Sequence, residues 1–423
     1  MPTLSEDLQF RGLVHQVTDP AVPALLDGGP VTAYAGFDPS APSLQLGNLV
    51  GVLNLVRLLR AGHRPIALAG GGTGMVGDPS GKEEERALLG ADALEANVAA
   101  IRSQLERFLD FDAGALLVDN GEWLWQVGLL EFLRDVGKHF TVNAMIARES
   151  VRARLEGREQ GISYTEFSYM LLQAYDYLRL FDLHGCRLQL GGSDQWGNIV
   201  SGVELIRRVR GAEAYGLTTP LLVDEHGRKL GKTETGTIWL DAGRTSPYRL
   251  FQYLLNTPDD RVGAYLRALT LLPGERIEEL DRATADHPER RDGQRALARE
   301  VVTLVHGAGE AAAAERAGRA LFGEEVAELD EATLLAVFAE APSTVLPRSA
   351  LEGDGVLLVE ALADCGLSPS RSAARKAVEQ GGAYVNNRRA TGLDRRLTGA
   401  DLLHDRYVVL RRGRRDHHLL RLG

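Results

Sequence analysis

The chain has 423 residues, of which 44% are hydrophobic and 25% are charged, a composition typical of a globular protein with two or three domains. Neither an apolar N-terminal segment nor a run of about 18 apolar residues is present, so the sequence predicts no signal peptide and no membrane span. The two cysteines, Cys186 and Cys365, are far apart and predict neither a disulfide framework nor a zinc site. We therefore expect a protein of the cytoplasm.

The distribution of charge separates the C-terminal end from the rest of the chain. The formal net charge of −10 excludes a protein that binds nucleic acid with its whole surface. Residues 366–423, however, contain 13 Lys and Arg against 5 Asp and Glu, a net charge of +8. This segment is either a local contact for a polyanion or a solvated basic tail, and charge alone does not separate the two.

The first half of the chain alternates short apolar runs with helical patterns, which is typical of a parallel α/β sheet. A sequence with helical periodicity between about 110 and 160 predicts an insertion into this fold. The predicted fold class is therefore α/β, with a parallel-sheet domain over 1–225. Its clearest predicted elements are strands at 31–37, 64–70 and 186–192 and a helix at 49–63.

Beyond residue 225 the character of the sequence changes. A polar loop occupies 226–245, and Ala-, Glu- and Arg-rich helical text predicts an all-α domain over 246–325. Residues 326–355 include a Pro-, Ser- and Gly-rich stretch and are expected to form a linker. A basic helix, a turn and a short strand then predict a small α+β domain over 356–423.

Residues 36–55 combine a strand end, a polar turn and a helix that begins near Gln45. The free N–H groups and the positive dipole end at a helix start favour phosphate, and Gly47 lets a nucleotide approach the backbone closely. Taken alone, the same text also fits a plain strand–turn–helix connection.

A second polar segment, 227–241, places Lys229 and Lys232 close together, directly before Thr233. Mobile ammonium groups suit the task of holding departing phosphates as negative charge builds up in a transition state. Taken alone, such a run is more often a surface loop.

A helix with polar residues on one face is predicted after Ser163. Ser163 and Glu166 have the spacing of a capping box, so a helix is expected to begin there. Tyr169, Gln173 and Asp176 then fall on one face of that helix. Core packing explains the tyrosine, but it does not explain the other two, whose polar groups are costly to bury without partners.

Together, the two polar segments resemble the paired signatures of the class I aminoacyl-tRNA synthetases, usually written HIGH and KMSKS. They stand here as QLGN at 45–48 and KLGKT at 229–233. Further segments are similar to the tyrosyl-tRNA synthetases, and this resemblance covers nearly the whole chain. The matching segments are YAGFDPS, GDPSGK, FLRDVGKHFTVN, YTEFSYMLLQAYDY, GGSDQWGNI and TSPY.

The resemblance implies a Rossmann-type catalytic domain, a helical anticodon-binding domain and a C-terminal RNA-binding domain. It also implies tyrosine–tRNA ligase activity in two steps. Tyrosine and ATP give tyrosyl-adenylate and pyrophosphate, and the tyrosyl group then moves to the terminal adenosine of tRNA(Tyr). Mg²⁺ is expected to arrive with ATP, with no metal held tightly by the protein. A homodimer through the insertion is implied, and neither DNA nor a membrane is an expected partner.

The resemblance also assigns roles to individual residues. The phenol hydroxyl of tyrosine is expected to meet Tyr34 and Asp176, an arrangement that rejects phenylalanine and for which this family is itself the standard example. The remaining tyrosine-binding residues are expected to be Asp78, Tyr169, Gln173 and Gln195. Those expected to bind ATP are Gly36, Asp38, Ser40, Gly47, Asn48, Gly192, Asp194 and Lys232. Those expected to act in catalysis are Gln45, Asn48, Lys82, Arg86, Lys229, Lys232 and Thr233. Those expected to contact tRNA are Arg371, Arg375, Lys376, Asn386 and Arg388.

One position departs from the family pattern in a way that bears on activity. Gln45 stands where the family commonly has a histidine, and an amide can donate a hydrogen bond but cannot become cationic. Charge-assisted hydrogen bonds are about twice as strong as neutral ones, so the change is expected to cost about 1 kcal/mol and to slow activation several-fold. Ser40 replaces a usual threonine and keeps the hydroxyl. Gln45 leaves open a second interpretation, a catalytically impaired RNA-binding paralogue.

Two further functions fit the sequence less well. The first is a nicotinamide-dependent oxidoreductase. Gly72, Gly74 and Gly77 match the dinucleotide-binding fingerprint, but Pro79 and the charged residues 82–86 follow, where the fingerprint is expected to continue into an apolar helix. Activation of tryptophan, on the same fold, leaves Tyr34 and Asp176 without a hydroxyl partner.

Overall fold

The computed structural model divides into two compact units. The larger comprises Met1–Arg244 with Thr257–Leu297, and the smaller comprises Thr245–Asn256 with Ala298–Gly423. In the part of the chain that is described, no helix is both long and apolar enough to cross a membrane. The structure describes residues 2–78, 89–148, 151–152, 155, 162–224, 226–233, 236–320, 325–339, 341–413 and 416–423.

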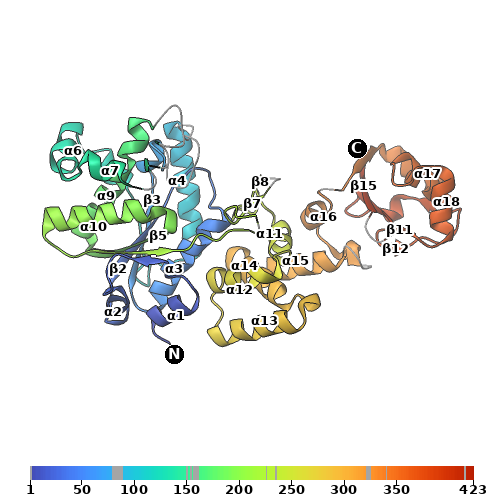
Figure 1. Cartoon of the computed structure of the whole chain (residues 1–423). Coiled ribbons are helices and arrows are strands. Elements are labelled where there is room, and N and C mark those ends of the chain that lie inside the picture. The colour runs from blue at the N-terminus through green and yellow to red at the C-terminus, as the bar shows by residue number, and fades with distance from the viewer. Residues whose placement is uncertain are drawn as a thin grey trace. The chain divides into compact units, whose positions relative to one another are not determined.

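The larger unit is built on a mainly parallel sheet (Figure 1). Within the described residues it has six strands in the order β1-β6-β5-β2-β3-β4, and only β1, at one edge, runs antiparallel to its neighbour. Its strands are β1 (Gln16–Val17), β2 (Thr32–Phe37), β3 (Arg64–Ala69), β4 (Leu116–Asp119), β5 (Cys186–Gly192) and β6 (Tyr215–Thr219). The three predicted strands are confirmed as β2, β3 and β5.

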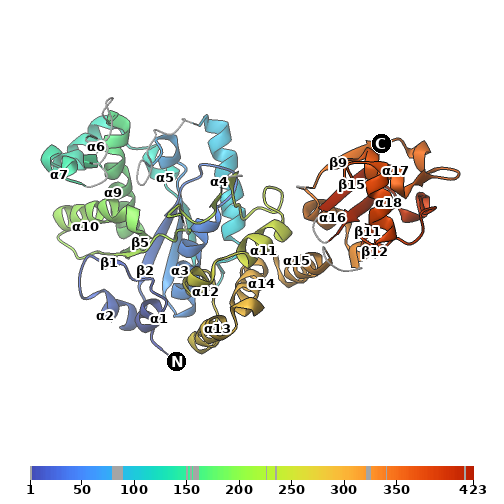
Figure 2. The same cartoon turned by 45° about the vertical axis from the view of Figure 1, so that its right-hand side comes forward.

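Helices cover the sheet, and α9 and α10 lie side by side against it (Figures 1 and 2). The predicted helix after β2 is confirmed as α3, and Gly62, with φ of 86°, lets the chain turn back into β3. The predicted start of α9 is confirmed as well, because the Ser163 hydroxyl accepts the backbone N–H of Glu166 at 3.2 Å. The helices of this layer are α1 (Leu4–Phe10), α2 (Val22–Asp27), α3 (Leu49–Arg60), α4 (Ala91–Leu105), α9 (Tyr164–His184) and α10 (Trp196–Arg210).

The predicted insertion, between about 110 and 160, includes strand β4 of the main sheet, so its expected start is too early. Between β4 and α9 the described residues form short helices and no strand, and several apolar side chains there are exposed. Its described helices are α5 (Gly121–Leu124), α6 (Leu129–Asp135) and α7 (Val142–Ile146).

The helices predicted over 246–325 are present, but they do not form one compact unit. Helices α12 (Asp259–Leu269) and α13 (Gly274–Asp286) belong to the larger unit, and α12 packs against α3. Helices α11 (Pro247–Leu255) and α15 (Ala308–Ala320) belong to the smaller unit and pack on each other, and α14 (Asp292–His306) spans the division. The single all-α domain expected from composition is therefore divided by packing.

The C-terminal part of the smaller unit is a small α+β fold, as predicted. Its described sheet has the order β12-β11-β14-β15-β9, and the first helices after residue 355 pack over a core that includes Leu362, Val378 and Leu410. Its elements are β10 (Val356–Leu357), α17 (Leu358–Asp364), α18 (Arg371–Glu379), β11 (Ala383–Val385), β12 (Arg388–Arg389), β13 (Arg396–Leu397), β14 (Tyr407–Arg412) and β15 (Asp416–Leu422).

The expected linker at 326–355 is wrong in its central part. Helix α16 (Glu331–Val337) forms there, and β9 (Ser343–Leu346) pairs in parallel with the last strand, β15. The pairing partner lies more than 70 residues away, so a local reading of Pro, Ser and Gly content could not reveal the strand. The C-terminal fold therefore begins before residue 356.

Candidate active site

A cavity of about 440 Å³ opens at the carboxyl ends of the parallel strands. The strand order reverses between β2 and β5, because the chain proceeds from β2 to β3 on one side and from β5 to β6 on the other. Ligands in open α/β sheets bind at such a switch point. The cavity is lined by sixteen of the predicted residues: Tyr34, Gly36, Asp38, Ser40, Gln45, Gly47, Asn48, Asp78, Tyr169, Gln173, Asp176, Gly192, Asp194, Gln195, Lys229 and Lys232.

Three predicted catalytic residues are not among the lining. Lys82 and Arg86 lie outside the described residues. Thr233 is in the hairpin of β7 (Lys232–Thr233) and β8 (Gly236–Thr237), and its hydroxyl donates to the Gly236 carbonyl at 2.8 Å. Thr233 therefore helps to close the hairpin and does not line the cavity.

A buried carboxylate and a buried phenol mark the deep end of the cavity. Asp176 is 1% exposed and accepts hydrogen bonds from Asn120 Nδ2 at 2.9 Å and Trp123 Nε1 at 2.8 Å. Burial raises the pKa of Asp176 to about 7, against the opposing effect of these two donors. The Tyr34 hydroxyl is buried with no hydrogen-bond partner among the described residues. Such a group costs free energy unless a ligand satisfies it.

Tyr34→Phe is therefore expected to stabilise the ligand-free protein and to weaken tyrosine binding. Removal of an unsatisfied buried hydroxyl should raise the free energy of unfolding by about 1 kcal/mol, and the lost bond to the ligand should weaken affinity about threefold to tenfold. Thermal melting and calorimetric titration with tyrosine measure the two effects. A lower melting temperature for the variant would show that the hydroxyl already has a partner.

A chain of amide groups connects the helices on the other side of the cavity. Gln195 Nε2 donates to Asp78 Oδ2 at 2.6 Å, and Gln195 Oε1 accepts from Gln173 Nε2 at 3.1 Å. Asn198 Nδ2 donates to Gln173 Oε1 at 2.9 Å. The chain brings together three of the predicted tyrosine-binding residues and leaves a carboxylate at its end, as a cationic ligand group requires.

Tyr169 on α9 also lines the cavity but is not part of this chain of amide groups. Its hydroxyl donates to Asp38 Oδ1 at 3.4 Å, which links the predicted tyrosine-binding and ATP-binding sets.

The two signature segments are joined by main-chain hydrogen bonds. Gln45 and Trp239 form an antiparallel bridge, and Leu46 N donates to the Ile238 carbonyl at 3.0 Å. These main-chain hydrogen bonds therefore hold the two segments next to each other, although they lie nearly 200 residues apart in sequence.

Glycine makes this close approach possible. A Cβ on Gly47 would lie 3.4 Å from the Leu230 carbonyl oxygen, and one on Gly231 would lie 3.2 Å from Leu46 Cβ. Gly231 also has φ of 82°, which favours glycine. These glycines thus fit the two segments to each other, which gives Gly47 a role beyond the expected close approach of a nucleotide.

Lys229 reaches across the cavity to Asp194, a carboxylate that is expected to bind ATP. Its Nζ lies 2.8 Å from Asp194 Oδ2, and the lysine side chain is 41% exposed. A half-exposed ion pair of this kind contributes little to stability. Breaking this ion pair when a ligand binds therefore costs little free energy.

Sequence reasoning missed the residues that support Asp176. Asn120 follows β4, a strand that was not predicted, and its Nδ2 also donates to Thr73 Oγ1 at 2.9 Å. Gln189 on β5 lines the cavity with a buried Oε1 that has no partner among the described residues. A polar residue at the end of an apolar run was the available signal for Asn120, because parallel strands end at the site.

The glycine run after β3 has a packing explanation. A Cβ on Gly71 would lie 2.3 Å from Asp119 Oδ1, and Gly72 N donates to Asn120 Oδ1 at 2.7 Å. Residues 73–75 form a 3₁₀ turn, where a dinucleotide fingerprint requires the start of a helix. Within the described ranges, no group of three or more His, Cys, Asp or Glu side chains is placed to hold a metal ion.

The predicted tRNA contacts lie in the C-terminal fold. Arg371, Arg375 and Lys376 are exposed on α18, and Arg388 is exposed on β12. The side chain of Asn386 donates to the Asp401 carbonyl at 2.6 Å and accepts from Val409 N at 2.9 Å. Its amide therefore holds the turn before β12, where φ is 48°.

Two parts of the chain match known families. Residues 26–323 match the family described as tRNA synthetases class I (W and Y). Residues 337–420 match the tyrosine–tRNA ligase SYY-like C-terminal domain, which agrees with a C-terminal fold that begins before residue 356.

Individual relatives give the same result. A tyrosine–tRNA ligase of Roseiflexus castenholzii is 53% identical over the full length of both chains, and one of Bacillus caldotenax is 49% identical over 99% of both. The structure of a C-terminally truncated mitochondrial tyrosyl-tRNA synthetase of Aspergillus nidulans matches with a TM-score of 0.69 and 33% identity, over 76% of this chain and 95% of that one. The chain belongs to the tyrosyl-tRNA synthetase family of class I.

Proposed function

We propose that the cavity activates tyrosine with ATP and that the protein then transfers the tyrosyl group to tRNA(Tyr). One observation supports tyrosine above all: a buried carboxylate and an unsatisfied buried phenol stand together at the deep end of the cavity. A ligand hydroxyl placed there gives each of them a hydrogen bond. Phenylalanine leaves both without one, and tryptophan offers no hydroxyl.

Catalysis of the first step is positioning together with charge stabilisation. The tyrosine carboxylate attacks the α-phosphate of ATP, and pyrophosphate leaves. Asp78, at the end of the amide chain, faces the ammonium group, with Gln173 and Tyr169 beside it. Asp194 is assigned to the ribose, and Gly36, Asp38, Ser40 and Gly192 line the nucleotide end. Mg²⁺ enters as the ATP complex.

The departing pyrophosphate gathers negative charge, and cationic or amide donors stabilise it. Lys229 and Lys232 provide ammonium groups at the cavity, and Gln45 and Asn48 lie at the turn that leads into α3. No side chain needs to become covalently attached to substrate.

Gln45→His is expected to raise the rate of tyrosine activation about fivefold below pH 6.5, where the imidazole is cationic. A charged donor stabilises the leaving pyrophosphate more than the neutral amide does. Single-turnover formation of tyrosyl-adenylate measures the effect. If the native chain is inactive and only the histidine variant is active, the impaired-paralogue interpretation replaces the one proposed here.

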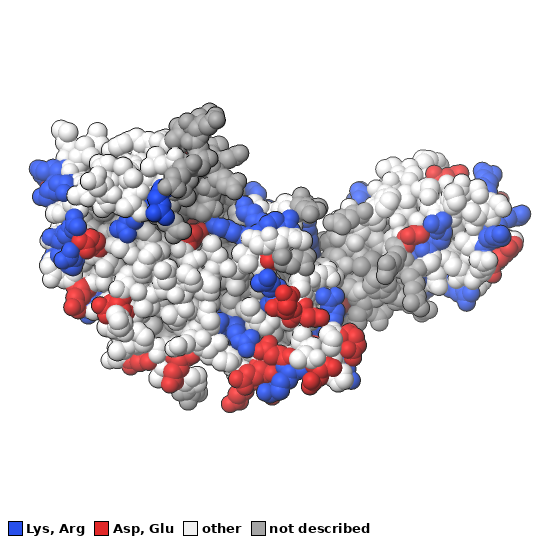
Figure 3. All heavy atoms as spheres, viewed as in Figure 1, with Lys and Arg blue, Asp and Glu red and all other residues white. Residues whose placement is uncertain are grey.

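Transfer to tRNA involves the C-terminal fold. Exposed Lys and Arg side chains on this fold suit contacts with phosphates on shaped RNA (Figure 3). Arg371, Arg375, Lys376 and Arg388 are the assigned contacts, and Asn386 shapes the turn that presents the last of them.

The active form is a homodimer formed through the insertion. Large apolar side chains there are exposed, with Trp125 at 63%, Leu129 at 73% and Leu130 at 82%. Exposed apolar clusters of this kind are typical of an interface between copies. The reaction takes place in the cytoplasm.

Charging of tRNA tests the complete proposal. The full chain is incubated with ATP, labelled tyrosine and tRNA(Tyr), and label in acid-precipitable RNA is counted. Labelled tRNA is the expected result, and its loss on removal of ATP is the control. Adenylate formation without labelled tRNA would contradict the transfer step and leave the activation step standing.

A further inference from the structure

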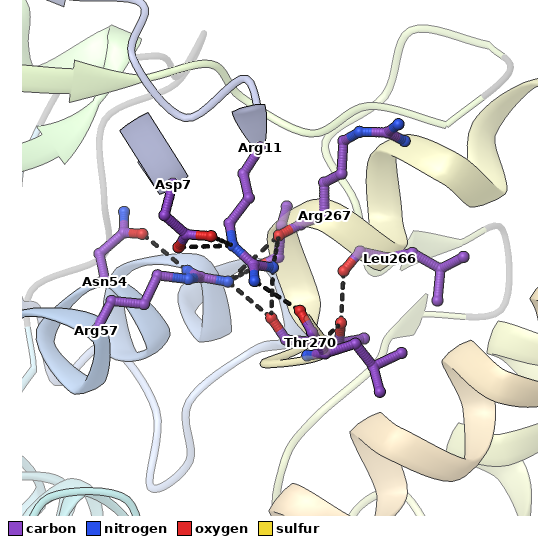
Figure 4. Close-up of polar contacts among 9 residues, drawn as sticks. Asp7, Arg11, Asn54, Arg57, Leu266, Arg267 and Thr270 are labelled. Atoms are coloured by element: carbon purple, nitrogen blue, oxygen red, sulfur yellow. Dashed lines mark hydrogen bonds and ion pairs between the residues drawn. The ribbon is translucent and has the colours of Figure 1, made fainter. Parts of the chain in front are cut away.

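Helix α12 is fastened at its C-terminal end to α3, the helix that follows Gln45 (Figure 4). The last carbonyls of a helix have no partner within it and form the negative end of its dipole. The guanidinium group of Arg57 on α3 donates to the carbonyls of Arg267 at 3.3 Å, Ala268 at 3.2 Å and Thr270 at 2.8 Å.

Arg11 supplies a second guanidinium group at the same end of α12, and Arg57 and Arg11 together form an arginine clamp. Arg11 donates to the carbonyls of Thr270 at 3.2 Å and Leu272 at 2.7 Å, and its Nε lies 2.8 Å from Asp7 Oδ2. Burial and the nearby Arg11 charge lower the pKa of Arg57 to about 9, so Arg57 stays cationic at neutral pH. Buried cations against a helix C-terminus make the position of α12 relative to α3 well defined.

A second contact of α12, made by Tyr265, reaches the residues that pair with the second signature segment. Tyr265, 4% exposed, donates its hydroxyl to the carbonyl of Val223 at 2.9 Å. Val223 is bridged to Lys229, and Leu230 N donates to the Leu222 carbonyl at 2.8 Å. Val223, whose carbonyl accepts the Tyr265 hydroxyl, is therefore the residue paired with the lysine that enters the cavity.

We propose that Tyr265 is a positioning residue for tyrosine activation, which sets Lys229 at the pyrophosphate position through Val223 while the arginine clamp fixes α12 to the helix after Gln45. The role rests on the adenylate-forming function proposed above. Tyr265 does not line the cavity, so it acts on the rate through the lysine and not by touching substrate.

Tyr265→Phe removes this single hydroxyl and is tested by tyrosine-dependent exchange of pyrophosphate into ATP. Rates are expressed per active site, counted by titration of bound tyrosyl-adenylate, so that any unfolded fraction does not contribute. We expect kcat to fall about threefold to tenfold, the worth of one neutral hydrogen bond, with KM for tyrosine unchanged. Tyr215→Phe is the matched control, because this buried tyrosine of the same unit donates to Glu213 at 2.9 Å at the far end of β6.

The decisive experiment introduces Tyr265→Phe into a chain that already carries Lys229→Met. If Tyr265 acts through the lysine, its effect there should shrink to less than twofold, because residues that work as one unit are not additive. An equal loss of kcat in both backgrounds, or a rise in KM for tyrosine, would overturn the inference. Absence of exchange by the native chain would instead contradict the proposed function itself.

Discussion

Replacement of Lys229 by methionine is expected to slow tyrosyl-adenylate formation by about 10²–10³-fold, the usual loss for one preorganised donor to a developing charge. The methionine keeps the length of the side chain and removes only the ammonium group. KM for tyrosine should stay unchanged, because Lys229 lies at the nucleotide end of the cavity, opposite Asp194. The melting temperature should hardly change, because the ion pair that is lost is partly exposed.

Stopped-flow or quenched-flow measurement of adenylate formation gives this rate, with Lys376→Met as the matched control. Lys376 is exposed on α18 and lies outside the cavity lining, and its assigned partner, tRNA, takes no part in this step. A loss below tenfold in the Lys229 variant would show that its ammonium group does not face the pyrophosphate in the transition state.

Asp176→Asn is expected to lower kcat/KM for tyrosine about 10²-fold and to leave kcat/KM for phenylalanine unchanged. A hydrogen bond from the substrate hydroxyl to a buried charge is worth about 3 kcal/mol, which equals this factor. The amide also presents an N–H toward donors that the carboxylate accepted, Asn120 Nδ2 and Trp123 Nε1. Selectivity for tyrosine over phenylalanine should therefore fall by the same 10²-fold.

The pH dependence of tyrosine binding follows from the same carboxylate. With a pKa of about 7, Asp176 is ionised at pH 8 and mostly protonated at pH 6 in the ligand-free protein. A substrate hydroxyl donates to the ionised form, so the dissociation constant for tyrosine should rise as the pH falls below about 7, by up to tenfold per unit. The folded-state pKa lies above the unfolded value, so this group's contribution to stability declines as the pH rises from about 4 to about 7.

Asp182→Asn on the same helix is the matched control for both effects. Asp182 pairs with Arg210 at 2.7 Å and is absent from the cavity lining. A pH-dependent dissociation constant that persists in Asp176→Asn would contradict the assignment of the titration to Asp176.

Most of the site residues were assigned through the resemblance to the tyrosyl-tRNA synthetases, and local patterns account for only some of them. The strand end before Asp38, the helix start after Ser163 and the glycines before Asp194 each place a polar group at the end of an element. The parallel sheet then brings these ends together, since the carboxyl ends of its strands meet at one edge. The strand order therefore explains why segments that the resemblance assigned separately line one cavity.

What the sequence did not reveal depends on contacts between distant segments. The partners of Asp176 come from the end of β4 and the first turn of the insertion, and no periodic pattern marks Asn120 or Trp123 as its donors. Strand β9 was hidden for the same reason, because it is defined by pairing with β15 and not by its own composition. The division of the predicted all-α segment likewise follows from packing of α12 on α3.

The most direct test of the account is exchange of labelled pyrophosphate into ATP by the native chain, with tyrosine, phenylalanine and tryptophan supplied in turn. Exchange with tyrosine alone is the predicted result, and it would establish the reaction, the substrate and the competence of Gln45 together. Absence of exchange from folded protein would contradict tyrosine activation itself, and equal exchange with phenylalanine would contradict the role assigned to the buried pair of Tyr34 and Asp176.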